Sequence, residues 1–583
     1  MKRKKLLGSI AAFLVAAPLL AGIIGAGATT AEAAAVTEKP SEISFTLHKK
    51  VWDTETGIPS STPNTGLEMD FSGAGLNGVD FTLYDVTNIY YNALQDDPQT
   101  EAAGDGLSSA DALQAIQDNW NASWVVNGAT ALETKTTANV NGEDGLVEFT
   151  NVRTTDGLNR DKVLMFVETY SPADISIIAT PMVILLPVMM PSITEGSAWD
   201  GSFLDTFNNE VHLYAKNQQQ TPTKKIAVDP SEITEIQVKE GEGTTTVKVV
   251  DLEKGVVLPY EITSPIPYFI RDVNTDQSPV ITNFTIVDVP TENLKYVTDS
   301  LEVVDTTSNT KLVLNTDYII TEENGGFLLE ILTKNAETGF ANTDTLAKLT
   351  PGSTLTLSYN MVLTATVQAD MLHDNQATIT IGREGETGYQ KDIIPEEKVL
   401  TGGRKFQKID GSSQDNLAGA EFILWNTDRS KYAVFYNGAD AMENYSSAAT
   451  NISWNDRGTD EDPAPNATHF MATAFDTGSG KDWSFDVVGL EYGNYQMQEV
   501  VAPEGYALPN GESAYTNFNV AWGTYDKEAV SVEKAENVTI SNTRKGTLPS
   551  TGGAGIVAFL VIGTGMMIGS YLWFKNSKRT VKA

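Results

Sequence analysis

Three sets of a lysine, an acidic residue and an asparagine recur in the same order along this 583-residue sequence. The three residues of each set lie in short runs in which apolar and polar residues alternate. Because side chains alternate between the two faces of a strand, all of them fall on the apolar face. One such case is often an accident of parity, but three in one order favour a shared purpose. The sets are Lys49, Glu168 and Asn217; Lys224, Asp288 and Asn375; and Lys408, Glu499 and Asn542.

Burial determines the chemistry open to such a set. A buried charge is costly, so burial shifts a lysine toward the neutral amine and a carboxyl toward its protonated form. A neutral amine is a nucleophile, and a protonated acid can donate to the asparagine side-chain carbonyl and polarise it. Attack of the lysine amine on the asparagine side-chain carbonyl, with loss of ammonia, would leave a Lys–Asn amide, which is an isopeptide bond. The acid of each set would promote this reaction. In the middle set Lys225 is adjacent to Lys224, and only strand parity selects between them.

The elements that must position these residues are strands. Short alternating runs rich in Val, Ile, Thr, Phe and Tyr are broken by Gly, Asn, Asp and Pro throughout. We expect an all-β chain of three tandem immunoglobulin-like β-sandwiches in an elongated array, over residues 36–217, 218–399 and 400–547. The first and third resemble diverged copies, since residues 417–424 repeat the pattern of residues 76–83. One helix is expected near residues 108–119.

The N-terminal end and the composition indicate an exported protein. Residues 1–33 combine a basic start, an apolar stretch and small residues, as in a signal peptide cleaved after Ala33 or Ala35. The sequence has no cysteine, so an exported chain of this size must be stabilised by its cores or by another covalent link. Its four histidines are scattered, and neither a metal site nor a cofactor is expected. A net charge of −36 disfavours nucleic acid as a partner.

The C-terminal segment, residues 548–583, has three parts. An apolar stretch at 553–574 has about the 20 residues that a helix needs to cross a bilayer. A basic tail follows, which holds that end on the cytoplasmic side. An ordinary membrane anchor would explain the stretch and the tail but not the pentapeptide immediately before them. The pentapeptide is Leu548, Pro549, Ser550, Thr551 and Gly552, and the tail carries Lys575, Lys578, Arg579 and Lys582.

This order resembles the sorting signal that sortases process in Gram-positive surface proteins, with the pattern Leu-Pro-any-Thr-Gly. The resemblance implies that a sortase cuts between Thr551 and Gly552 and holds Thr551 as a thioester. The chain would then touch the membrane only before sorting. It would end on the bacterial surface, anchored to peptidoglycan by a housekeeping sortase.

The exported part is similar to the sortase-assembled backbone pilins. Glu499 and the following Ala502–Tyr506 match that family's E-box. The resemblance implies that the three domains are collagen-adhesin folds of B, A and B type with intramolecular isopeptide bonds. It makes the set around Lys408 the firmest assignment, the set around Lys49 the next, and the set around Lys224 the least certain.

Residues 207–217 resemble the family's pilin motif, Trp-x-x-x-Val-x-Val-Tyr-Pro-Lys-Asn. They depart from it at Phe207, Leu213 and Ala215. Parity turns Lys216 away from the apolar face, so we expect it to be exposed. The resemblance implies that Lys216 attacks the Thr551 thioester of a neighbouring subunit and extends a head-to-tail fibre.

The resulting hypothesis is a structural shaft subunit of a covalent pilus. Its partners would be a pilus-specific sortase, identical subunits and ancillary pilins. The alternative is a monomeric wall-anchored adhesin in which Lys216 is not used. An enzyme has little support, because the sequence shows no nucleophile elbow, metal cluster or signature carboxylate pair, and the isopeptide sets would react only once, on their own chain.

Overall fold

The computed structural model describes residues 39–53, 64–70, 72–191, 199–203, 210–240, 243–383, 388–475, 481–525, 536–546 and 554–577. The chain is all-β, as predicted, and forms two compact units. The first unit contains Met1–Asp251, Gly255–Val367 and Met371–Leu400, and the second contains Leu252–Lys254, Gln368–Asp370 and Thr401–Ala583. The division into three domains at residues 217 and 399 stays a prediction.

The first unit opens with a β-sandwich. One sheet has the order β5-β6-β1-β12-β8, with β2 beside β1, and the facing sheet has the order β4-β3-β7-β9. Alternate residues of both sheets, among them Phe45, Leu47 and Phe166, form the core between them. The strands are β1 (Glu42–Asp53), β2 (Ala74–Gly75), β3 (Asp80–Asp85), β4 (Thr130–Thr136), β5 (Ala138–Val140), β6 (Glu143–Arg153), β7 (Val163–Tyr170), β8 (Ile175–Ile177), β9 (Met182–Leu185) and β12 (Glu210–Gln219); β10 (Met189–Pro191) pairs with β11 (Trp199–Phe203).

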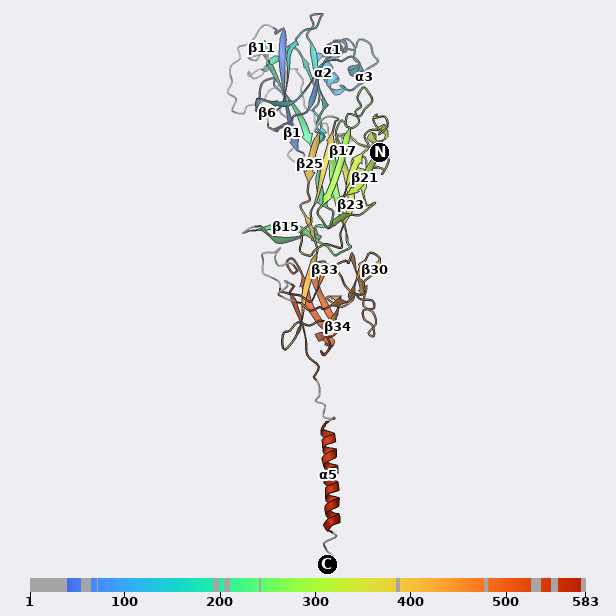
Figure 1. The fold of residues 1–583 in the computed structure, drawn as a ribbon. Helices are drawn as coiled ribbons and strands as arrows, with labels where there is room; N and C mark the ends of the chain where they lie inside the picture. The colour runs from blue at the N-terminus through green and yellow to red at the C-terminus, as the bar shows by residue number, and fades with distance from the viewer. Residues whose placement is uncertain are drawn as a thin grey trace, which may run out of the picture. The chain divides into compact units, whose positions relative to one another are not determined.

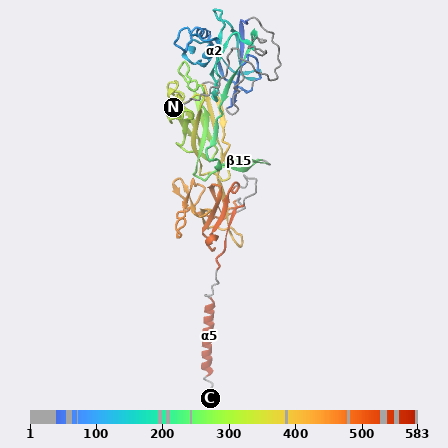
Figure 2. The ribbon, with the colours of Figure 1, turned by 180° about the vertical axis from the view of Figure 1, so that it is seen from behind.

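Three helices pack on the outer face of the β4-β3-β7-β9 sheet. They are α1 (Thr87–Ala93), α2 (Ser109–Asp118) and α3 (Ser123–Val126), and α2 is labelled from behind in Figure 2. Leu113 and Ile116 of α2 lie in one apolar cluster with Met165 of β7, which explains why this face is also apolar. The helix expected near residues 108–119 is confirmed, with Ser108 as its N-cap. The two shorter helices were not predicted.

The rest of the first unit holds a second pair of large sheets and a small one. Their orders are β13-β16-β23-β19-β20, with β18 beside β23, then β21-β22-β17-β24-β25, and β14-β15-β26 (Figure 1). The elements are β13 (Thr223–Ile226), η1 (Pro230–Glu232), β14 (Thr234–Glu240), β15 (Gly243–Asp251), β16 (Val257–Pro265), β17 (Asn283–Pro290), β18 (Leu294–Tyr296), β19 (Glu302–Asp305), β20 (Thr310–Lys311), β21 (Tyr318–Glu323), β22 (Gly326–Ile331), α4 (Thr343–Leu346), β23 (Thr354–Leu363), β24 (Asn375–Gly382), β25 (Tyr389–Ile393) and β26 (Lys398–Leu400).

The second unit is another sandwich, followed in sequence by a long helix. One sheet has the order β33-β27-β36; the other has the order β30-β29-β28-β34-β35, with β31 beside β29 and β32 beside β28. The elements are β27 (Gly402–Asp410), β28 (Glu421–Asn426), β29 (Lys431–Asn437), β30 (Asp440–Ala441), β31 (Asn451–Asp456), β32 (Phe470–Met471), β33 (Phe485–Leu490), β34 (Gly493–Val501), η3 (Gly511–Ala514), β35 (Tyr515–Val520), β36 (Val538–Asn542) and α5 (Ala554–Ser577). Within α5, Val557–Ser577 is apolar enough and long enough to cross a membrane, with a mean hydropathy of 1.7.

The first sandwich and the second unit share one topological feature. In each, an early strand pairs in parallel with the last one: β1 with β12, and β27 with β36. The register is the same in both, since Lys49 faces Ala215 and Lys408 faces Ile540. Each asparagine of the predicted sets lies two residues beyond that partner, on the same face as the lysine. This shared register agrees with the internal repeat inferred from the sequence.

Candidate functional site

The first candidate site lies inside the N-terminal sandwich. Lys49 on β1 and Asn217 on β12 come from one sheet, and Glu168 on β7 comes from the facing sheet. Lys49 Nζ donates to Glu168 Oε2 at 2.6 Å and contacts Asn217 Oδ1, and Asn217 Nδ2 donates to Glu168 Oε1 at 2.7 Å. None of the three side chains is more than 1% exposed. The structure therefore brings this predicted set together in a buried core.

The second unit repeats this arrangement. Lys408 on β27 and Asn542 on β36 share a sheet, and Glu499 is on β34 of the other sheet. Lys408 Nζ lies 2.8 Å from Glu499 Oε2 and contacts Asn542 Oδ1, while Asn542 Nδ2 donates to Glu499 Oε1 at 2.7 Å. The same atoms meet in both sites, so the two form one geometric class.

In both sites the acid contacts the amide nitrogen of the asparagine rather than its carbonyl oxygen. The sequence argument had the acid donating to the carbonyl, but that oxygen faces the lysine amine. One carboxyl oxygen accepts a hydrogen bond from the lysine amine, which is the nucleophile. The other accepts one from the amide nitrogen that would leave as ammonia. A carboxyl in this position can take a proton from the amine and deliver one to the leaving group.

Burial changes the electrostatics of all three lysines. Removal from water lowers the pKa of Lys49 and of Lys408, against the attraction of Glu168 and Glu499. It lowers the pKa of Lys224 to about 8, against the attraction of Asp288. A lower pKa raises the fraction of neutral amine, which is the nucleophilic form.

The middle site is built differently. Lys224 is on β13 of one sheet, whereas Asp288 on β17 and Asn375 on β24 are on adjacent strands of the other sheet. Lys224 Nζ donates to Asp288 Oδ2 at 2.5 Å. Asn375 Nδ2 donates to the hydroxyl of Tyr359 at 3.2 Å, and Asn375 Oδ1 is buried without a hydrogen-bond partner in the described part of the chain. Here the lysine and asparagine strands are not paired.

The structure separates Lys224 from Lys225. Lys224 points into the core against Asp288, with its side chain 0% exposed. Lys225 points the other way and pairs with Glu261 at 2.8 Å, with its side chain 56% exposed. The parity argument that selected Lys224 therefore agrees with the geometry.

Lys216 lies on β12, one residue before the asparagine of the first site. It is half-buried, although the sequence analysis expected it to be exposed. Other parts of the chain contact its strand on both sides of this position. β1 pairs with β12 in parallel, with Lys50 opposite Lys216. The side chain of Asn64 forms hydrogen bonds with the main chain of Tyr214 on β12. Burial lowers the pKa of Lys216, which favours the neutral amine.

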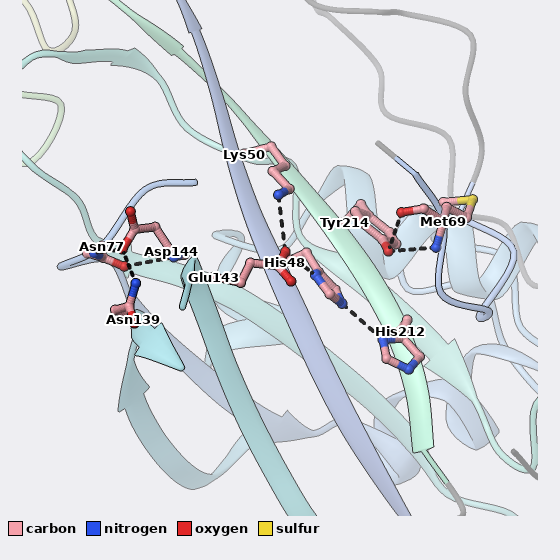
Figure 3. Close-up of polar contacts among 10 residues, drawn as sticks. His48, Lys50, Met69, Asn77, Asn139, Glu143, Asp144, His212 and Tyr214 are labelled. Carbon is pink, nitrogen blue, oxygen red and sulfur yellow. Dashed lines mark hydrogen bonds and ion pairs between the residues drawn. The ribbon is translucent and has the colours of Figure 1, made fainter. Parts of the chain in front are cut away.

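A polar cluster lies on the strands beside Lys216 (Figure 3). His48 on β1 contacts Glu143 at 3.1 Å and His212 on β12 at 2.9 Å, and its ring stacks on Tyr214 with centroids 4.5 Å apart. The Tyr214 hydroxyl accepts a hydrogen bond from Met69 N at 2.7 Å and lies 2.9 Å from Met69 O. These contacts fix the part of β12 that leads into Lys216. Sequence reasoning missed them, because the two histidines are far apart in the chain.

Sequence reasoning also missed aromatic neighbours of the lysines. Lys49 Nζ lies 5.4 Å from the ring centre of Phe81, and Lys408 Nζ lies 5.6 Å from that of Phe422. The two rings occupy matching places in the repeated segments 76–83 and 417–424, so that repeat could have revealed them. Tyr359 had no such signal.

Several predicted features lie outside the described residues. They are the signal peptide at residues 1–33, both of its cleavage positions, and the pentapeptide Leu548–Gly552 that contains Thr551. The apolar helix that follows it is described above.

Three sequence-family models match the chain. Residues 40–218 match the N-terminal domain of the Gram-positive pilin subunit D1, residues 402–533 match a prealbumin-like fold domain, and residues 540–582 match the LPXTG cell wall anchor motif. No curated protein matches the sequence.

Solved pilin structures show a distant likeness. The full-length RrgB pilus protein of Streptococcus pneumoniae is 16% identical, with 89% of this chain and 100% of that chain covered and a TM-score of 0.45. The full-length major pilin SpaD of Corynebacterium diphtheriae is 18% identical, covering 88% and 100%, with a TM-score of 0.38. BcpA, the major pilin subunit of Bacillus cereus, is 12% identical, covering 86% and 100%, with a TM-score of 0.36.

The matched families occur in a definite order along the chain. A pilin N-terminal domain comes first and a cell wall anchor comes last. The matched families are structural components of the cell surface and not enzymes. The chain therefore carries the N-terminal domain of a Gram-positive pilin subunit and an LPXTG cell wall anchor motif, which identify it as a pilin anchored to the cell wall.

Proposed function

We propose that this pilin is a shaft subunit whose sandwiches are locked by internal Lys–Asn isopeptide bonds and whose copies are joined head to tail by sortase. The internal bonds join Lys49 to Asn217, Lys224 to Asn375 and Lys408 to Asn542. The bond between copies joins Thr551 of one to Lys216 of the next. Ancillary pilins and peptidoglycan are further covalent partners in this proposal.

One observation gives the main support for the proposed internal bonds. In two separate sandwiches, a buried lysine amine contacts both an acid and an asparagine amide, with the same atoms meeting in the same way. Burial of a lysine and an acid is costly, since removing two charges from water costs several kcal/mol per ion. Covalent capture of the amine would remove the part of that cost that belongs to the lysine.

The reaction follows from the contacts. The neutral amine of Lys49 attacks Cγ of Asn217, and Glu168 Oε2 takes the proton that the amine gives up. Glu168 Oε1 supplies a proton to Nδ2, the Cγ–Nδ2 bond breaks, and ammonia leaves. The packed core holds the groups in contact, so proximity replaces an external catalyst.

The link between copies rests on the pilin motif and the sorting signal. Lys216 lies on a strand held by β1 and by the His48 and Tyr214 contacts, and its pKa is lowered by burial. A rigid strand presents the amine in one place, which favours attack on a sortase-bound thioester. An open chain of copies follows, because the two joined sites are different surfaces.

Intact mass of the exported chain without its anchor, residues 36–547, tests the internal bonds. Each bond releases one ammonia, so the measured mass should fall short of the sequence mass by about 17 Da per bond, about 51 Da in all. Peptide mapping should find the three Lys–Asn pairs cross-linked. A mass equal to the sequence mass would refute the internal bonds and leave a plain wall-anchored chain.

A further inference from the structure

The middle site contains a fourth polar side chain, which neither of the other two sites has among the described residues. In those sites one glutamate reaches both the lysine amine and the asparagine amide nitrogen. Asp288 is one methylene shorter than a glutamate, and no hydrogen bond joins it to Asn375 among the described residues. The hydroxyl of Tyr359 lies between them, donating to Asp288 Oδ2 at 2.6 Å and accepting from Asn375 Nδ2 at 3.2 Å.

The packing around Tyr359 holds this hydroxyl in place. Tyr359 is on β23 and is 2% exposed. Tyr260, its partner across β16 and β23, stacks on it with ring centres 5.7 Å apart, and Phe327 from the facing sheet meets it edge-on at 5.0 Å. A side chain packed against these two rings has little freedom to point its hydroxyl elsewhere.

We propose that Tyr359 is a catalytic residue of the middle isopeptide bond, relaying a proton between Asp288 and the departing amide nitrogen of Asn375. The inference rests on the proposed function, because it concerns the Lys224–Asn375 bond. Lys224 and Tyr359 both contact the same oxygen, Asp288 Oδ2. That oxygen is therefore the point where a proton can pass from one to the other.

In the relay, Asp288 and Tyr359 each take up one proton and give one up. The Lys224 amine attacks Cγ of Asn375 and forms the new C–N bond, and its surplus proton passes to Asp288 Oδ2. Tyr359 gives its hydroxyl proton to Nδ2 and receives the proton from Asp288. The Cγ–Nδ2 bond breaks and ammonia leaves, so that Asp288 and Tyr359 return to their starting states. No further reactant is needed.

The electrostatics of the site favour this order of proton transfers. Burial and the charge of Asp288 raise the pKa of Tyr359 well above its ordinary value, so the hydroxyl keeps its proton until the attack. Asp288 Oδ1 and Asn375 Oδ1 are both buried acceptors without a hydrogen bond in the described part of the chain. A proton arriving on Asp288 converts a carboxylate that can only accept into a group that can also donate.

The test follows formation of each bond by intact mass and peptide mapping in newly made residues 36–547. Tyr359→Phe keeps the ring and removes the hydroxyl, and should slow the middle bond by about 100-fold, the usual effect of losing a general acid–base group. The bonds at Lys49 and Lys408 should form as before and report that the chain has folded. Tyr318→Phe, the same change at a buried tyrosine of β21 outside the site, should leave all three bonds unchanged.

A second variant tests whether Tyr359 is needed because the Asp288 side chain is too short to contact Asn375 directly. If Tyr359 serves to extend a short acid, then Asp288→Glu combined with Tyr359→Phe should restore the middle bond, because glutamate spans the gap in the other two sites. Unchanged bond formation in Tyr359→Phe would overturn the inference, and so would a folded double variant that stays unbonded. Failure of the wild-type chain to form the middle bond would instead refute the proposed function at that site.

Discussion

Lys49 Nζ touches Asn217 Oδ1 although the two residues are 168 positions apart in the sequence. The contact exists because β1 and β12 pair in parallel, with Asn217 two residues beyond the partner of Lys49. Lys408 and Asn542 repeat this offset on β27 and β36. A covalent bond at either place would tie an early strand of a sandwich to its last strand, as a disulfide would in a chain that has cysteines.

Replacing the acid of the C-terminal site should stop its bond. Glu499→Gln keeps the size of the side chain but replaces one acceptor oxygen with an NH2 group, and it cannot move a proton between Lys408 and Asn542. We expect that bond to form about 100-fold more slowly. Intact mass after a short expression should then show one ammonia fewer lost than in the wild type.

The matched control for that change is Glu512→Gln. Glu512 pairs with Arg429 on the surface, with its side chain 83% exposed. The Glu512→Gln variant should lose as much ammonia as the wild type. Full bond formation in Glu499→Gln would contradict the role given to the acid.

Loss of the C-terminal bond should lower the stability of the second unit. Asn542→Ala would remove the proposed cross-link between residues 134 positions apart, while leaving the Lys408–Glu499 pair in place. The chain-entropy account of cross-links gives about 5 kcal/mol for such a loop. Calorimetry should show a lower unfolding temperature for this unit, whereas Asn510→Ala, at an exposed helix cap without a side-chain cap bond, should change little.

The neighbouring lysines Lys224 and Lys225 offer a paired test. Lys224→Ala should abolish the middle bond, because it removes the amine that contacts Asp288. Lys225→Ala removes only a surface pair with Glu261 and should keep the bond. Peptide mapping should show in each variant whether the peptide that contains Asn375 is cross-linked. A cross-link that survives in Lys224→Ala would mean that another residue is the nucleophile.

Polymerisation should depend on Lys216. Lys216→Arg keeps the positive charge but removes the nucleophile that could attack the Thr551 thioester. In cells that make the pilus, the ladder of covalent polymers seen on denaturing gels should disappear and monomers should remain on the cell wall. Lys225→Arg serves as the control and should leave the ladder intact. A normal ladder from Lys216→Arg would favour the monomeric adhesin.

Acid should weaken the first unit through His48. Burial lowers the pKa of His48 below its ordinary value of 6.5, against the attraction of Glu143, while His212 and Lys50 oppose its protonation. The unfolded chain therefore binds a proton more readily than the folded one, so this contribution to stability is present above pH 6.5 and is lost as the pH falls below it. The unfolding temperature of the first unit should fall across that range.

His48→Gln checks the cause of that pH dependence. The variant should be less stable at neutral pH but should show a shallower decline on acidification. His469→Gln, in the second unit, should leave the profile of the first unit unchanged. An equally steep decline in His48→Gln would assign the acid sensitivity to other groups.

The sequence by itself determined the class of protein and most of the candidate chemistry. Period-two alternation placed Lys49, Lys224 and Lys408 on apolar faces, because a strand has only two faces and parity decides between them. The α2 helix was also predicted, from apolar residues at helical spacing. The sorting signal was legible because its three parts lie in order along the chain.

Only the tertiary structure decided which atoms meet. The parallel pairing of β1 with β12 depends on strands that are far apart in the sequence, and no local pattern encodes it. The same holds for Tyr359, which reaches Asp288 and Asn375 across the sandwich, and for the partial burial of Lys216. Strand parity says which face a side chain occupies, whereas register and sheet packing, which are long-range, determine its neighbours and its distance from them.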